Sequence, residues 1–233
     1  FGIRKCLCST LKPTLLPFPE IYNSRECAEF VSQFLEYEPL DSCCPPTILP
    51  SPTQVLEWGI GDSFDFAIVL ASFLLGSGYE AYVVFGSAPI SICTKDTSSI
   101  DYPHSIESQV QEKVSSLKSM SDGNDLTTRP TLKKQTSSKD DLHSVHSWVL
   151  VRSNIRCEGT KDYFIEATSG FHYSLDCHPY EEIYAIWNNK NYYVNATQDP
   201  FFHSNLDDWL PVFGDKTEPP IEISWVSGLA ISE

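Results

Sequence analysis

The sequence has few basic residues and no long run of apolar residues. Among its 233 residues, 16 are Lys or Arg and 31 are Asp or Glu, so the formal net charge is −15. A surface of this sign repels the phosphate backbone, which argues against nucleic acid as a partner. The longest apolar stretch, residues 66–75, is shorter than the roughly 18 residues that a membrane-spanning helix needs. We therefore expect a soluble protein with neither a nucleic-acid nor a membrane partner.

The sequence also lacks a regular spacing of cysteine or histidine. Its eight cysteines follow no repeating interval, and its six histidines share no metal-binding pattern. We expect free thiols in a reducing, cytoplasmic compartment, no metal and no other cofactor. Residue 1 is Phe1 and no apolar signal core follows it, so we expect the chain to be a piece of a longer protein.

Composition divides the chain into five segments. About one third of the central segment is Ser or Thr, and its apolar residues are too sparse to form a core. The five segments are a Pro-interrupted N-terminal extension with one helix (residues 1–48), a helix-bearing half-domain (49–93), a disordered insertion (94–142), a sheet-bearing half-domain (143–214) and a C-terminal segment leading to a missing remainder (215–233).

Residues 63–76 are expected to form a helix at the centre of the domain. Apolar side chains cover most of its circumference, which is typical of a buried helix. A turn at residues 59–61 precedes it, and Asp62 is a suitable N-cap.

The remaining periodicity favours strands. Residues 79–86 are rich in β-branched and aromatic side chains, and the segments after the insertion alternate in the same way. A short helix is expected to end near Trp209. One helix followed by several strands predicts an α+β fold, with a central helix packed on an antiparallel sheet. The expected strands are residues 79–86, 146–151, 163–166, 183–187 and 192–195.

Three residues stand in an order that suits nucleophilic catalysis. Ser63 follows a Gly-containing turn at a helix N-terminus, His146 lies on a strand and Glu166 lies on the next strand. Cys-His-Asp hydrolases and acyl transferases use this layout. The helix end places about half a positive charge beside the nucleophile, the imidazole takes its proton and the carboxylate fixes the tautomer.

Four motifs surround these residues: VLEWGIGDSFDFA at 55–67, GYEAYVVFG at 78–86, HSWV at 146–149 and FIE at 164–166. In order and placing they resemble the transglutaminase-like domain of the papain-like cysteine-protease superfamily. Three further motifs, LPSPTQVLEWG at 49–59, SGFHYS at 169–174 and IWNNKNYYVN at 186–195, are similar to one family of coiled-coil proteins of the ciliary and flagellar axoneme. The resemblance implies a transglutaminase-like, papain-like fold over residues 49–93 and 143–214.

The resemblance also implies a loss of catalysis. Ser63 stands where the superfamily has its nucleophilic cysteine, and a hydroxyl is far harder to ionise at neutral pH than a thiol. Cys93 lies beyond the strand, so we expect no other cysteine to replace the nucleophile. Glu57 and Trp58 occupy the neighbourhood of the oxyanion donor, where a carboxylate would repel a developing oxyanion. Glu166 in place of Asp adds one methylene, which alone would not disable the site.

The expected function is therefore that of a pseudoenzyme, a catalytically inactive transglutaminase-like domain that serves as a structural and interaction module. The resemblance implies that its partners are other protein subunits of the axonemal nexin-dynein regulatory complex. It implies a cytoskeletal location in the cilium or flagellum and a role in regulating motility. An alternative is a Ser-His-Glu hydrolase or acyl transferase with Ser63 as nucleophile, His146 as base and Glu166 as orienting group. A third possibility is that Ser63 replaces a native cysteine.

Overall fold

The structure is a computed structural model that describes residues 6–40, 44–96, 143–154, 161–195 and 209–211. Nearly all of the expected insertion and the whole expected C-terminal segment lie outside the described residues, so the five segment boundaries stay predictions. Within these ranges, no helix is long and apolar enough to cross a membrane.

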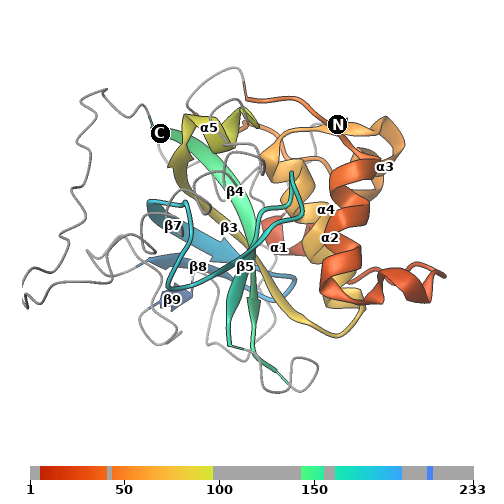
Figure 1. Cartoon of the computed structure of the whole chain (residues 1–233). Helices are drawn as coiled ribbons and strands as arrows, with labels where there is room; N and C mark the ends of the chain where they lie inside the picture. Colours follow the sequence, from red (N-terminus) through yellow and green to blue (C-terminus); the bar gives the residue numbers. More distant parts are fainter. Residues whose placement is uncertain (1–5, 41–43, 97–142, 155–160, 196–208, 212–233) are drawn as a thin grey trace, which may run out of the picture. The chain divides into compact units, whose positions relative to one another are not determined.

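A seven-stranded antiparallel sheet forms the centre of the fold (Figure 1). Its strand order is β6-β5-β4-β3-β7-β8-β9. The two longest strands, β3 and β4, pair along their whole length. In the sequence, β3 precedes the expected insertion and β4 follows it. The strands are β3 (Glu80–Pro89), β4 (His143–Arg152), β5 (Tyr163–Ile165), β6 (His172–Ser174), β7 (Glu182–Trp187), β8 (Tyr192–Asn195) and β9 (Trp209–Pro211).

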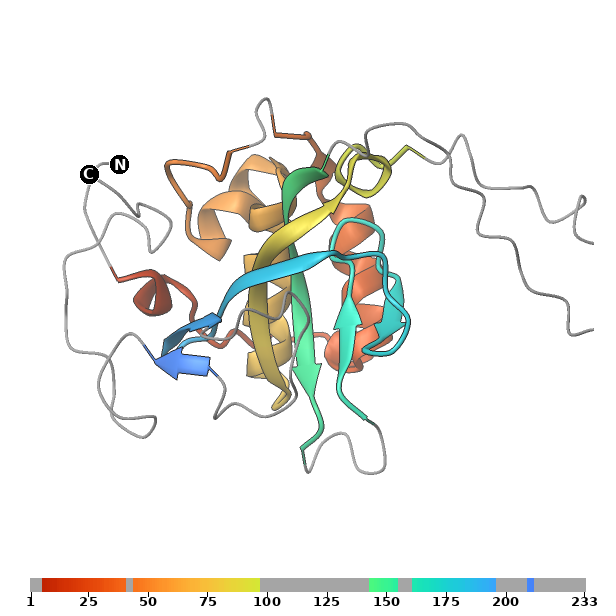
Figure 2. The same ribbon diagram turned by 90° about the vertical axis from the view of Figure 1, so that its left-hand side faces the viewer.

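Helices α2, α3 and α4 lie on one side of this sheet (Figure 2). Helix α4 packs directly on β3 and β4, while α2 and α3 pack on α4. The predicted α+β class with a central helix on an antiparallel sheet is confirmed. The elements before and beside the sheet are α1 (Leu7–Thr10), the 3-10 helix η1 (Pro19–Tyr22), α2 (Ser24–Phe34), α3 (Pro52–Trp58), α4 (Ser63–Gly76), α5 (Ile90–Cys93) and the short parallel strands β1 (Glu36–Tyr37) and β2 (Ile60–Gly61).

The start of α4 is fixed by two carboxylates. Asp62 Oδ1 accepts hydrogen bonds from the backbone N–H of Phe64 at 2.7 Å and of Asp65 at 3.1 Å, and Asp65 Oδ2 accepts from the Asp62 N–H at 3.1 Å. This is a capping box, so the predicted N-cap and helix are confirmed. A Cβ at Gly61 would lie 2.6 Å from Asp65 Cβ, so only glycine allows the capping carboxylate this close.

Side chains of β4 alternate between two cores. Val149 and Val151 belong to the larger core, which lies between the sheet and α4. Trp148 and Leu150 belong to a smaller core on the opposite face of the sheet. His146 lies two residues before Trp148 in the same strand, so its side chain is on that opposite face as well.

The strand predictions are confirmed, with one correction at the C-terminal end of the sheet. Trp209, expected at the end of a short helix, lies in β9 and pairs with Asn195 of β8. Its side chain is buried in the smaller core, so sheet pairing and burial decide its conformation. The rest of that predicted helix lies outside the described residues.

Candidate functional site

His146 and Glu166 form a buried hydrogen-bonded pair. Strand β4 positions His146, and Glu166 follows directly after β5, so the pair joins two neighbouring strands. The His146 Nε2–H donates to Glu166 Oε2 at 2.9 Å. Thr168 donates to Glu166 Oε1 through its backbone N–H at 3.2 Å and its hydroxyl at 2.8 Å, and the Tyr180 hydroxyl donates to Oε2 at 3.1 Å. Both carboxylate oxygens are thus fully engaged.

The two partners shift each other's protonation. Burial alone would lower the pKa of His146, but the Glu166 carboxylate, helped by the Cys93 thiol, raises it to about 10. Burial would raise the pKa of Glu166, but His146 and the Thr168 hydrogen bonds together hold it below its usual range. At neutral pH the pair is therefore an imidazolium and a carboxylate.

An aromatic stack fixes the plane of the imidazole. The rings of Trp148 and Tyr180 stack with centroids 3.8 Å apart and an interplanar angle of 4°. The His146 ring lies 6.3 Å from Trp148 and 6.5 Å from Tyr180, at 22° and 24° to their planes. Phe164 contacts Tyr180 edge-on at 5.6 Å. The imidazole thus has little freedom to reorient.

Ser63 is not joined to this pair by a hydrogen bond. It is the first residue of α4 and is 1% exposed, and its Oγ has no hydrogen-bond partner among the described residues. The Nδ1 atom of His146, on the ring edge away from Glu166, also lacks one. Of the three predicted triad residues, the structure joins His146 and Glu166 by a hydrogen bond, and Ser63 at the start of α4 makes none to them.

Glu57 and Trp58, the predicted oxyanion neighbourhood, lie in the last turn of α3. Both side chains are exposed, and Glu57 Oε2 accepts a hydrogen bond from Gln54 Nε2 at 3.1 Å. Gly59 then ends the helix in the left-handed conformation, with φ of 70°, and leads into the turn before Ser63. The assignment of an oxyanion neighbourhood to these residues stays a prediction.

Cys93 lies near His146, although the two residues are far apart in the sequence. Helix α5 follows β3 and brings the Cys93 thiol to 3.6 Å from the Ala88 carbonyl oxygen and 3.8 Å from the Ser144 carbonyl oxygen. Its nearness raises the pKa of His146. Cys93 lies beyond β3, as predicted, but β3 and β4 pair Ala88 with Ser144 and so bring the end of one strand to the start of the other. That long-range pairing leaves no local signal in the sequence. That Cys93 does not replace the nucleophile stays a prediction.

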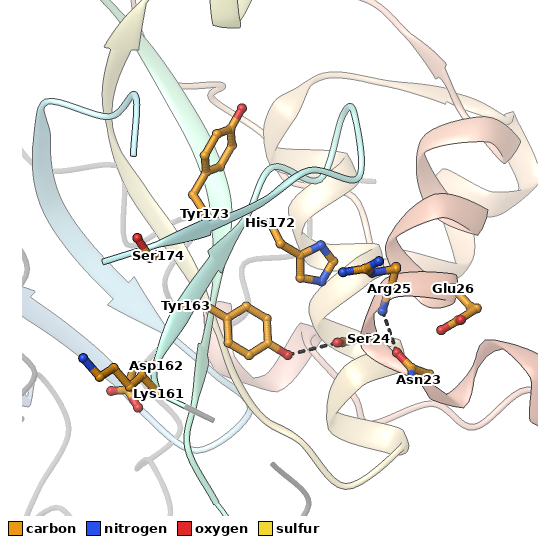
Figure 3. A pocket seen from close by; sticks show the side chains of 10 residues that line it. All are labelled: Asn23, Ser24, Arg25, Glu26, Lys161, Asp162, Tyr163, His172, Tyr173 and Ser174. Atoms are coloured by element: carbon orange, nitrogen blue, oxygen red, sulfur yellow. Dashed lines mark hydrogen bonds between the residues drawn. The ribbon is translucent and has the colours of Figure 1, made fainter. Parts of the chain in front are cut away.

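A separate concavity of about 640 Å³ lies between α2 and the β5 and β6 strands (Figure 3). The Tyr163 hydroxyl donates to Ser24 Oγ at 3.0 Å across its floor, and burial lowers the pKa of His172. Arg25 and Glu26, and likewise Lys161 and Asp162, balance one another in charge. The charged residues that line the concavity therefore sum to no net charge. Among the described residues, no group of three or more His, Cys, Asp or Glu side chains could hold a metal ion.

No protein-family model matches the chain. The chain is 37% identical to Dynein regulatory complex subunit 7 of Macaca fascicularis over 227 aligned residues, which cover 83% of this chain and 26% of that protein. It is 36% identical to Dynein regulatory complex subunit 7 of Chlamydomonas reinhardtii over 170 residues, covering 72% of this chain and 13% of that protein. It is 28% identical to the Coiled-coil domain-containing protein lobo of Drosophila melanogaster, covering 82% of this chain and 27% of that protein. The chain thus spans about a quarter of the length of the mammalian relatives that it matches.

Proposed function

We propose that this chain is a catalytically inactive transglutaminase-like domain that acts as a structural and interaction module of the axonemal nexin-dynein regulatory complex. In that role it resides in the cytoskeleton of the cilium or flagellum and helps to regulate motility. The observation that carries the proposal is the similarity to Dynein regulatory complex subunit 7, at 36% to 37% identity in proteins of a primate and a green alga. Its partners are other protein subunits of that complex.

The protonation of His146 supports catalytic inactivity. A general base must be unprotonated when it takes a proton from the nucleophile. The Glu166 carboxylate raises the pKa of His146 to about 10, so the imidazole already carries both of its protons at neutral pH. Ser63 Oγ is buried and makes no hydrogen bond to the ring. These features disfavour the alternative of a Ser-His-Glu hydrolase or acyl transferase.

The acidic surface indicates the chemistry of the partner. With a net charge of −15, the chain favours basic faces of neighbouring protein subunits over acidic ones. We propose that such charge complementarity contributes to docking, and that binding weakens as the salt concentration rises.

Axonemal retention tests the proposed location. The 233-residue chain, fused to a fluorescent protein, is expressed in ciliated cells, and the cilia are then extracted with detergent. We expect the fusion to remain on the axoneme, whereas the fluorescent protein alone is washed out. Equal extraction of the two would refute the proposed association.

A turnover assay tests the proposed inactivity separately. The purified chain is incubated with a glutamine-donor peptide and a primary amine, and separately with activated esters. We expect no product above background, and no difference between the chain and its Ser63→Ala variant. Turnover that disappears in Ser63→Ala would establish the hydrolase or acyl-transferase alternative, while leaving the axonemal location untouched.

A further inference from the structure

Helices α2 and α3 both end in an exposed aromatic side chain. Phe34 is the last residue of α2 and Trp58 is the last residue of α3, and the two residues are 51% and 46% exposed. Ile60, in β2 just after α3, is 37% exposed. Large apolar side chains that gather at one place on a surface mark a site of interaction with another molecule. The proposed catalytic inactivity assigns no role to these three residues.

The short parallel strands β1 and β2 bring the two helix ends together. The Glu36 N–H donates to the Gly59 carbonyl oxygen at 2.9 Å, and Glu36 is the register partner of Ile60. Successive side chains of a strand point to opposite faces, and Gly61 is buried where Ile60 is exposed. Ile60 and Glu36 therefore share the outer face of this two-stranded ladder, beside the ends of both helices.

Carboxylates flank the apolar side chains. Glu36, Glu38 and Glu57 are all exposed. Residues 26–94 contain nine Asp or Glu and no Lys or Arg. The Lys95 Nζ lies 5.6 Å from the centre of a tyrosine ring in β1 and offsets only part of this charge. We call the three apolar residues and these three glutamates the acidic-apolar surface.

The fold holds the acidic-apolar surface in place. The Phe34 ring stacks on Phe30 with centroids 5.3 Å apart, and Phe30 in turn contacts Phe73 of α4 at 6.3 Å. The Glu38 N–H donates to the Gly61 carbonyl oxygen at 3.0 Å, next to the bond that Glu36 makes. A surface that is ordered before binding loses little conformational entropy when a partner docks.

We propose that the acidic-apolar surface is the docking site for an amphipathic helix of another protein, with a stripe of apolar residues and Lys or Arg on both sides of it. The apolar stripe covers Phe34, Trp58 and Ile60, and the basic side chains pair with the surrounding carboxylates. A second copy of this chain is a poor occupant, because two surfaces of the same negative charge repel each other. The inference rests on the proposed function, since it names a docking site and a partner chemistry for the proposed interaction module.

Binding of a model helix tests the proposal. The probe is a fluorescein-labelled peptide of about 20 residues, composed of Leu and Lys, with all leucines on one helical face. Its control has the same composition in an order that gives no apolar stripe, so the two peptides carry the same charge. Fluorescence anisotropy with the 233-residue chain gives both dissociation constants. We expect the striped peptide to bind at least about tenfold more tightly.

Substitution of the aromatic residues tests the apolar contact. The double variant Phe34→Ser, Trp58→Ser should bind the striped peptide about tenfold more weakly or worse. The matched control is Phe171→Ser, Leu210→Ser, which removes two exposed apolar side chains from other elements. It should change the dissociation constant by less than about twofold. Circular dichroism verifies that each variant is folded.

Substitution of the glutamates tests the charge complementarity. The double variant Glu36→Gln, Glu57→Gln should weaken binding several-fold at low salt, and the loss should shrink as salt screens the charges. The matched control, Glu20→Gln, Asp176→Asn, removes the same charge at two exposed positions in other elements. If the control weakens binding as much, the attraction comes from the net charge of the chain and the docking site is refuted.

Photocrosslinking locates the bound peptide. With a photoreactive residue in its leucine stripe, the striped peptide should label the segments 34–38 and 57–61, as mapped by mass spectrometry. Labelling confined to other segments, equal binding of the two peptides, or an unchanged dissociation constant in the aromatic double variant would each overturn the docking site. Self-association of the chain that this variant abolishes would assign the surface to a second copy and overturn the proposal too.

The same aromatic variant separates this inference from the proposed function. In ciliated cells, the fluorescent fusion of the chain should stay on the extracted axoneme and the variant fusion should be washed out. Retention of both would refute the docking site and leave the axonemal role intact. Loss of both would refute the axonemal role, and the peptide measurements would still decide the docking site.

Discussion

Replacing Glu166 by Gln tests whether the buried pair is ionised. The amide retains an oxygen that can accept from Thr168, but it removes the negative charge beside the His146 ring. Breaking a buried ion pair on one side costs about 3 to 5 kcal/mol, and His146 can lessen this cost by releasing its proton. At pH 7 we therefore expect the free energy of unfolding to fall by about 3 kcal/mol, at the lower end of that range.

The pH dependence of this loss follows from the sign of the pKa shift. The pKa of His146 is about 10 in the folded chain and near 6.5 in the unfolded chain, so its contribution is fully present below about pH 6.5 and is lost as the pH rises toward 10. Within that window the contribution falls by about 1.4 kcal/mol per pH unit. In Glu166→Gln, burial without the carboxylate lowers the pKa of His146 instead, so the slope above pH 7 disappears.

Urea unfolding at about pH 7, 8 and 9 measures the effect, with the fluorescence of the buried tryptophans as the signal. The difference between the chain and Glu166→Gln should shrink by about 1.4 kcal/mol per pH unit, because groups common to both proteins cancel. The exposed Glu20 provides the matched control, and Glu20→Gln should change the free energy of unfolding by less than about 0.5 kcal/mol at every pH. A difference that stays constant or grows with pH would mean that His146 is neutral in the fold.

Two further substitutions probe the surroundings of the pair. Asp65 Oδ1 is buried without a partner, and burial together with the charge of Asp62 raises the pKa of Asp65 to about 7. A raised carboxyl pKa destabilises the fold once the group ionises, so Asp65→Asn should raise the free energy of unfolding by about 1 to 2 kcal/mol at pH 8 and by less at pH 5. Urea unfolding at both pH values measures this, and an equal change at both would contradict it. Tyr180→Phe removes the hydroxyl that donates to Glu166 but keeps the stack on Trp148, so it should lower the free energy of unfolding by about 1 to 2 kcal/mol; an unchanged urea midpoint would count against this bond.

Local signals in the sequence were sufficient to predict the central helix and most of the sheet. The N-cap at Asp62 and the apolar circumference of residues 63–76 are properties of consecutive residues, and they decide where α4 begins and how deeply it is buried. Strand β9 escaped prediction because its three residues become a strand only by pairing with β8. Trp209 alone, without that partner, has no preference strong enough to indicate a strand.

The site was predictable only in part, because some of its residues meet through contacts between distant segments of the chain. His146 and Glu166 could be paired from the sequence because one lies in β4 and the other directly follows the adjacent strand β5. Tyr180 and Cys93 reach the pair from a loop and from a four-residue helix, through contacts that depend on the register of β3 and β4 and on side-chain packing. No periodic pattern in the sequence predicts these contacts between distant segments.

The charge on His146 supports the proposal that the His146–Glu166 pair does not serve serine catalysis. A His-Glu pair on neighbouring strands suggests a catalytic base, but a carboxylate with all of its hydrogen bonds satisfied, facing a fully buried ring, stabilises the imidazolium instead. An imidazolium cannot accept the proton of a hydroxyl at Ser63. The same electrostatic arrangement therefore disfavours the Ser63 hydroxyl as a nucleophile, and the Glu166→Gln variant should weaken the fold.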